Sequence, residues 1–136
     1  MRIFLAFSLF FLSASVFAQL ERTLHQTFSL DSIDQVQVDL TGEVTCETWA
    51  GAGLLTETHV ELYNASKDLL TFFVEKQERY LVEEKRSAPS LQISSAQSER
   101  RAIQYRGEVC TENVRITVYV PEEFEISGNQ LTRKPD

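Results

Sequence analysis

The most reactive side chains in this sequence belong to its two cysteines, Cys46 and Cys110. Strand alternation places both sulfurs on apolar faces, where they can meet. The chain begins with an export signal, described below, and exported thiols meet an oxidising environment. We therefore predict one structural disulfide, which closes a loop of about 65 residues and contributes roughly 4 kcal/mol. The alternative is two buried free thiols that act as small hydrophobic residues.

The two histidines, His25 and His59, are the other candidate metal ligands. A tetrahedral zinc site needs four ligands that converge on one point, and two of them usually lie a few residues apart. Here no two of the four are close in sequence, and the histidines take the polar parity of their strands while the cysteines take the apolar one. The sequence therefore predicts no metal and no cofactor, with both histidines on solvated strand faces.

Residues that support catalysis lack the spacing that catalysis needs. No serine lies in a Gly-x-Ser-x-Gly turn between a strand and a helix. The acidic doublets Glu83-Glu84 and Glu122-Glu123 place neighbouring carboxylates on opposite faces of a strand, so they do not converge on one substrate atom. The glycine-rich segment Gly51–Gly53 leads into a strand rather than a helix, which indicates a turn and not a phosphate loop. We predict that the protein is not an enzyme.

Three aromatic residues are the candidate binding residues. Tyr63 and Tyr119 fall on the polar parity of their strands, and Trp49 stands beside the glycine turn. Exposed aromatic rings can stack on sugars or anchor a protein partner. The structural alternative is that these rings form cross-strand pairs that stabilise a sheet.

The amino-terminal segment has the features of a secretory signal peptide. Residues 1–18 contain Arg2 as their only charge, an apolar run over Ile3–Leu12 and a small-residue cleavage site at Val16–Ala18. Residues 19–136 then form one domain with 12 basic and 20 acidic residues, a net charge of about −8. This acidic balance argues against a nucleic-acid partner. No later apolar run is long enough to span a membrane, so we expect an exported protein of the periplasm, the cell surface or the medium.

Most of the exported part alternates apolar with polar residues, which predicts β-strands. Gly42 suggests a bulge or bend within the second strand. The predicted strands cover residues 24–30, 36–46, 56–62, 80–84, 91–93, 114–120 and 124–126. Residues 127–136 are expected to form a polar tail.

In one segment the spacing of apolar residues changes from every second residue to every third or fourth. Leu69, Leu70, Phe72 and Phe73 recur at helical spacing, and Ser66 before them can cap a helix amino terminus. We predict one short helix over residues 66–77.

The order of these pieces resembles a large family of secreted bacterial β-repeat domains, the adhesin-type domains that include auto-transporter adhesin heads of the GIN type. The resemblance covers residues 24–126. It rests on Tyr63–Leu70 leading to Arg79–Glu84, on the closing run Val114–Ile126 with its Val-Pro-Glu, and on a leader that ends in Ala before Gln19.

The resemblance implies an extracytoplasmic stack of short strands with no catalytic residues. Longer members continue with further repeats after the Val-Pro-Glu strand, so an open sheet edge is expected near 124–126, where a second copy or another chain can add a strand. We predict an all-β fold, either a short β-solenoid or a β-sandwich-like stack of antiparallel strands with one short helix. The expected function is an adhesin-like cell-envelope module that contacts protein or glycan through a sheet face or an open edge. The alternative is a small periplasmic carbohydrate- or ligand-binding protein with a pocket near Trp49.

Overall fold

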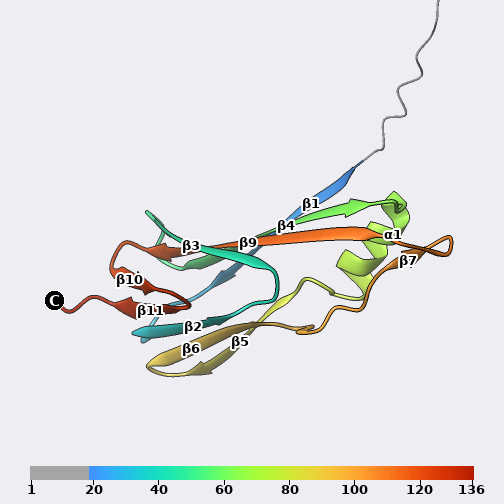
Figure 1. The fold of residues 1–136 in the computed structure, drawn as a ribbon. Coiled ribbons are helices and arrows are strands. Elements are labelled where there is room, and N and C mark those ends of the chain that lie inside the picture. Colours follow the sequence, from blue (N-terminus) through green and yellow to red (C-terminus); the bar gives the residue numbers. More distant parts are fainter. Residues whose placement is uncertain (1–18) are drawn as a thin grey trace, which may run out of the picture.

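Two β-sheets face each other and enclose the main hydrophobic core (Figure 1). The structure is a computed structural model that describes residues 19–136, and the expected signal peptide at 1–18 lies outside the described residues. The predicted, predominantly β fold is confirmed in its sandwich form. In the part of the chain that the structure describes, no helix has the length and apolar character needed to cross a membrane.

Sheet A contains four long strands. In spatial order they are β1 (Leu20–Phe28), β4 (Leu54–Tyr63), β9 (Thr111–Pro121) and β3 (Glu43–Trp49). The first three pair antiparallel, and β3 runs parallel to β9 at the edge. The buried residues of β4 alternate strictly with half-buried ones, as the period of two predicts.

Sheet B contains five shorter strands. In spatial order they are β10 (Phe124–Ser127), β11 (Gln130–Arg133), β2 (Gln35–Asp39), β6 (Ser90–Ser95) and β5 (Val82–Ser87). The strand β10 pairs only with β11, so the predicted sheet edge at 124–126 is confirmed. A separate two-residue ladder joins β7 (Gln104–Tyr105) to β8 (Glu108–Val109).

The core between the sheets is built from the inward residues of both. Sheet A contributes Leu54, Ile116, Val118 and Val120, and sheet B contributes Val36, Val38, Leu91, Ile93, Phe124 and Leu131. Each of these side chains is at most 4% exposed. Burial of this apolar set provides the main driving force that holds the two sheets together.

Two sequence predictions are corrected by this topology. The segment 36–46 is not one bulged strand, because the chain leaves sheet B after β2 and enters sheet A as β3. Gly42, with φ +133°, lies at the crossing. The predicted polar tail at 127–136 is also wrong, because β11 lies between β10 and β2 with Leu131 fully buried. Leu131 is the only apolar residue of β11, so alternation could not reveal the strand.

The predicted helix is confirmed in position but is shorter and of two kinds. The α-helix α1 (Lys67–Thr71) begins after Ser66, whose hydroxyl accepts a hydrogen bond from the Leu69 amide at 3.1 Å. It continues directly into a π-helical turn, η1 (Phe72–Lys76). In Figure 1 the helix lies at one end of the sandwich, where Leu70 packs in a second core cluster with Val60, Leu62, Tyr80, Ile103 and Cys110.

A buried ion pair joins the end of the helical segment to β9. Arg79 is 4% exposed, and its guanidinium donates two hydrogen bonds, at 2.8 and 2.9 Å, to Glu112, whose side chain is 17% exposed. The guanidinium also donates to the Arg101 carbonyl at 2.7 Å. The Tyr80 hydroxyl donates to the same carboxylate. Paired and hydrogen-bonded in this way, the buried charges compensate each other.

The predicted disulfide is wrong, and both cysteines are free thiols. Cys46 on β3 lies opposite Val118 of β9. Cys110 comes just before β9 and is eight residues before Val118 in the sequence. Eight strand residues span about 26 Å, but a disulfide needs Cα atoms within about 7 Å. Each thiol faces a core as parity predicted, but the two face different cores.

We expect reductant to leave the thermal unfolding midpoint unchanged, because no covalent bond closes the fold. Thiol titration of the protein, unfolded in guanidinium without reductant, should find two reactive groups per chain. Titration of the folded protein provides the control and should be slow, since burial raises the pKa of both thiols. A chain that yields no thiol until reductant is added would contradict the separated positions of Cys46 and Cys110.

The substitution Glu112→Gln should destabilise the protein by about 3 kcal/mol, because it leaves the buried Arg79 charge unpaired. Urea denaturation measures this loss. The matched control is Arg22→Gln, which breaks the surface pair of Arg22 with Glu75, whose side chains are 38% and 54% exposed. That control should cost less than about 1 kcal/mol. Equal losses in the two variants would contradict the importance of the buried pair.

The contribution of Glu112 also has a defined pH dependence. Burial raises its pKa, but the hydrogen bonds from Arg79 and Tyr80 and the charges of Arg79 and Arg100 outweigh burial, so the net pKa is lowered. The stabilisation is therefore complete above the ordinary glutamate pKa, about 4.3, and is lost as the pH falls through the lower folded value. The stability difference between the native protein and Glu112→Gln should shrink below about pH 4.

Candidate functional site

The outer face of sheet A carries most of the side chains that sequence analysis selected. Alternate residues of its four strands point away from the core, because successive side chains of a strand alternate between faces. The outward residues include His25 on β1, His59 and Tyr63 on β4, Tyr119 on β9 and Trp49 on β3. Parity predicted the outward direction of both histidines, Tyr63 and Tyr119, and the fold brings these residues and Trp49 to one face.

Trp49 and Tyr119 form a pair on this face. Trp49 ends β3, opposite Pro121, and Tyr119 lies one outward position back along β9. The ring centroids are 6.1 Å apart and the planes are tilted by 47°. Both residues are half-buried, so the two rings together form an apolar platform that remains partly open to solvent.

The glycine turn after β3 fixes the indole in place. The Trp49 Nε1 group donates a hydrogen bond to the Gly53 carbonyl at 3.0 Å. A methyl group at Gly51 would lie 2.2 to 2.6 Å from the indole atoms Cζ2, Cε2 and Cη2, so only glycine allows the ring to lie this close to the backbone. The turn predicted from Gly51–Gly53 therefore positions Trp49.

Carboxylates flank the aromatic pair. Glu47 on β3 lies opposite Tyr119. On β4, Leu55 lies opposite Tyr119, and Glu57 is the next outward residue after Leu55. Burial and the negative charges of Glu57 and Glu47 raise the pKa of Tyr119. The His25 imidazole lies 3.1 Å from Glu57. We name Trp49, Tyr119, Glu47 and Glu57 the aromatic patch.

Tyr63 does not belong to the aromatic patch. Tyr119 lies opposite Leu55 of β4, and Tyr63 is eight residues beyond Leu55 on the same strand. This separation corresponds to about 26 Å. The Tyr63 hydroxyl donates to Glu61 at 3.3 Å, and burial together with the Glu61 charge raises its pKa. The structure thus brings together two of the three predicted binding residues.

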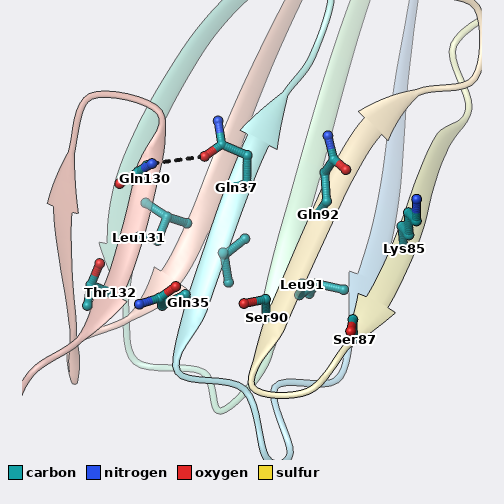
Figure 2. Close-up of a pocket in the computed structure, with 11 residues that line it drawn as sticks. Gln35, Gln37, Lys85, Ser87, Ser90, Leu91, Gln92, Gln130, Leu131 and Thr132 are labelled. Carbon is teal, nitrogen blue, oxygen red and sulfur yellow. Dashed lines mark hydrogen bonds between the residues drawn. The ribbon is translucent and has the colours of Figure 1, made fainter.

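The outer face of sheet B carries a different surface. A hollow of about 460 Å³ lies there, and Figure 2 shows amide and hydroxyl side chains across its strands. Gln130 donates to Gln37 at 3.2 Å, and Gln92 and Lys85 continue the same row. Neither Trp49 nor the glycine turn lines this hollow. It offers hydrogen bonds without a stacking ring, so the aromatic patch is the better-equipped surface for a ligand.

Only the first acidic doublet lies in a strand, β5, where alternation separates its carboxylates as predicted; Glu122 and Glu123 lie in the turn between β9 and β10. Glu83 lies opposite Ser94, and Glu84 lies opposite the buried Ile93 and accepts a hydrogen bond from Arg86 at 3.2 Å. Of the second doublet, Glu123 pairs with Arg133 at 3.1 Å. One carboxylate of each doublet, Glu84 and Glu123, is therefore held by an arginine.

Glu47 and Glu57 were not among the predicted site residues, although both have the outward parity of their strands. Their significance depends on which strands are neighbours, and only the fold supplies that information. Comparison of the chain with protein-family models, with curated proteins and with solved structures finds no match.

The substitution Gly51→Ala should displace the indole, because the added methyl group would overlap it. Trp49 is the only tryptophan of the chain, so its fluorescence reports this site alone. We expect emission at longer wavelength and stronger quenching by acrylamide as the ring moves into solvent. The control is Gly107→Ala, whose φ of +77° makes the substitution destabilising but whose added methyl group has no atom within 4 Å, so the native-state emission spectrum should not change. An unchanged spectrum in Gly51→Ala would show that the turn does not position the indole.

Proposed function

We propose that this chain is a non-enzymatic binding module of the bacterial cell envelope that takes a saccharide at the aromatic patch. The observation that carries the proposal is the Trp49–Tyr119 pair, which is partly solvent-exposed and held by a turn that only glycine permits. An apolar ring fixed before binding loses little conformational entropy when a ligand arrives.

The chemistry of the patch suits a sugar ring. A pyranose has an apolar C–H face that packs on an aromatic ring, and hydroxyl groups around its rim that donate hydrogen bonds. Glu47 and Glu57 beside the rings provide carboxylate acceptors, which form the stronger, charge-assisted kind of hydrogen bond. Stacking and acceptors thus occur side by side on one surface.

The charge of the chain narrows the saccharide class. The full sequence has a formal net charge of −7, and the carboxylates of the patch add local negative charge. Acidic polysaccharides are repelled by such a surface. We therefore propose a neutral or amino-bearing glycan. The leader-like segment and the resemblance to secreted adhesin-type domains support a place in the cell envelope.

A second candidate, protein binding or self-association by strand addition at β10, has one observation in its favour. The strand β10 has a free edge, which can accept another strand. It is only four residues long, and Phe124, its most apolar residue, is 1% exposed and fills the core. Few hydrogen bonds and no free apolar side chain are left for a partner, so the aromatic patch is favoured.

Isothermal titration with cellohexaose, xylohexaose, laminarihexaose and chitohexaose tests the proposal. We expect binding of at least one of the four, with a matching change in Trp49 fluorescence and no shortening of the saccharide on long incubation. The substitutions Trp49→Ala and Tyr119→Ala should each weaken binding by about 2 kcal/mol, close to thirty-fold in Kd.

Tyr63→Ala is the matched control, because it removes an aromatic ring from the same sheet face outside the patch, and it should leave Kd unchanged. Urea denaturation of each variant separates a binding defect from unfolding. The proposal is wrong if none of the four saccharides binds, or if Tyr63→Ala weakens binding as much as Trp49→Ala does.

A further inference from the structure

A second group of side chains converges on the outer face of sheet A, near Tyr63. Glu21 on β1 and Glu61 on β4 are direct cross-strand partners, and His59 lies one outward position from Glu61. One ligand atom from each of these three residues lies within 4.8 Å of the others. Three metal-binding groups from two adjacent strands therefore surround one point.

The carboxylates of Glu21 and Glu61 repel each other across the two strands. Like charges directly opposite each other on antiparallel strands destabilise the pairing. Three groups now offset this repulsion. The Gln19 amide donates to Glu21 at 2.9 Å, and the Tyr63 hydroxyl and the Arg115 guanidinium donate to Glu61 at 3.3 and 3.2 Å. A metal ion between the carboxylates would neutralise both at once.

His59 is held in the orientation that a metal ligand needs. Its Nε2 lies 3.3 Å from Glu61, and its Nδ1 lies 3.0 Å from the Thr23 hydroxyl. A hydroxyl can donate or accept, so Thr23 supports either form of the ring. When a metal replaces the proton on Nε2, the proton on Nδ1 can be donated to Thr23, which fixes the ring as the outer partners of metal-bound histidines do.

We propose that Glu21, His59 and Glu61 form a site for a divalent transition metal, with Zn²⁺ as the best-suited ion. One imidazole nitrogen with two carboxylate oxygens is a ligand set that Zn²⁺ accepts, and three protein ligands leave a fourth tetrahedral position for water or for a group of a partner. The site shares no residue with the aromatic patch, although Glu57 of that patch lies one outward position from His59 on β4. It does not depend on the saccharide proposal.

Arg115 competes with the metal for Glu61. Its side chain is 56% exposed, compared with 17% for Glu61. A long, exposed side chain can move into solvent at little cost. Metal binding must displace this contact, so removing the Arg115 charge should strengthen binding.

Titration of the purified, untagged and chelator-treated protein with ZnCl₂ tests the proposal. We expect one equivalent of Zn²⁺ per chain. The substitution His59→Gln should weaken binding at least about tenfold, and Thr23→Val, which leaves all three ligands in place, should weaken it by roughly tenfold to a hundredfold. Arg115→Gln should tighten binding, a result that a folding defect would not produce.

The chain offers a matched control for each alternative zinc ligand. His25→Gln removes the other histidine of the same sheet face and should leave the affinity unchanged. Cys46→Ser and Cys110→Ser remove the free thiols and should also have no effect. Thermal unfolding in chelator should show that His59→Gln folds as the native protein does. The proposal is overturned if the native protein binds no Zn²⁺, if His59→Gln and His25→Gln weaken binding equally, or if a cysteine substitution abolishes it.

Discussion

The antiparallel pairing of β4 with β9 is the interaction that joins the core to both surface sites, because Tyr119 lies on β9 and His59 and Glu61 lie on β4. These two strands are the central pair of sheet A, and their alignment places Leu55 beside Tyr119 and Leu62 beside Glu112. Because side chains alternate between faces, a shift of one residue would turn every outward group inward. Burial of Val60, Leu62, Ile116 and Val118 makes such a shift costly. The inner face therefore fixes where the outer residues lie.

At the helical end, polar contacts add to the apolar packing of the second core cluster. Arg79 contacts Glu112, and Arg100 donates to the Arg79 and Thr41 carbonyls, at 3.3 and 3.0 Å. The Arg100 guanidinium also lies 5.4 Å from the centre of the Tyr80 ring. A network whose members are all hydrogen-bonded defines one arrangement of the surrounding loops. The loop that follows β6 is thereby held against the amino-terminal end of β9.

Local pattern predicted what depends on neighbouring residues in sequence. Alternation identified β4 and β9, a change of period located the helix, and Ser66 marked its start. What failed depends on distant residues. Alternation could not show that Gly42 separates strands of different sheets, or that Leu131 completes the core. Parity placed Cys46 and Cys110 correctly on inner faces, but it carries no information about distance along the sheet, and so the disulfide was predicted wrongly.

The difference between local and long-range information also explains which residues of the surface sites could be predicted from the sequence. Parity selected Tyr63 and Tyr119, because an aromatic residue on a polar face stands out in a sequence, and Trp49 was selected because it precedes the glycine turn. Parity could not select Glu21, because a glutamate on such a face is ordinary until its cross-strand neighbour is known to be Glu61. Conspicuous residue types can therefore be found from sequence, whereas sites made of common residues become visible only when the alignment of the strands is known. On a β-sandwich with an acidic surface, sites of the second kind require the fold.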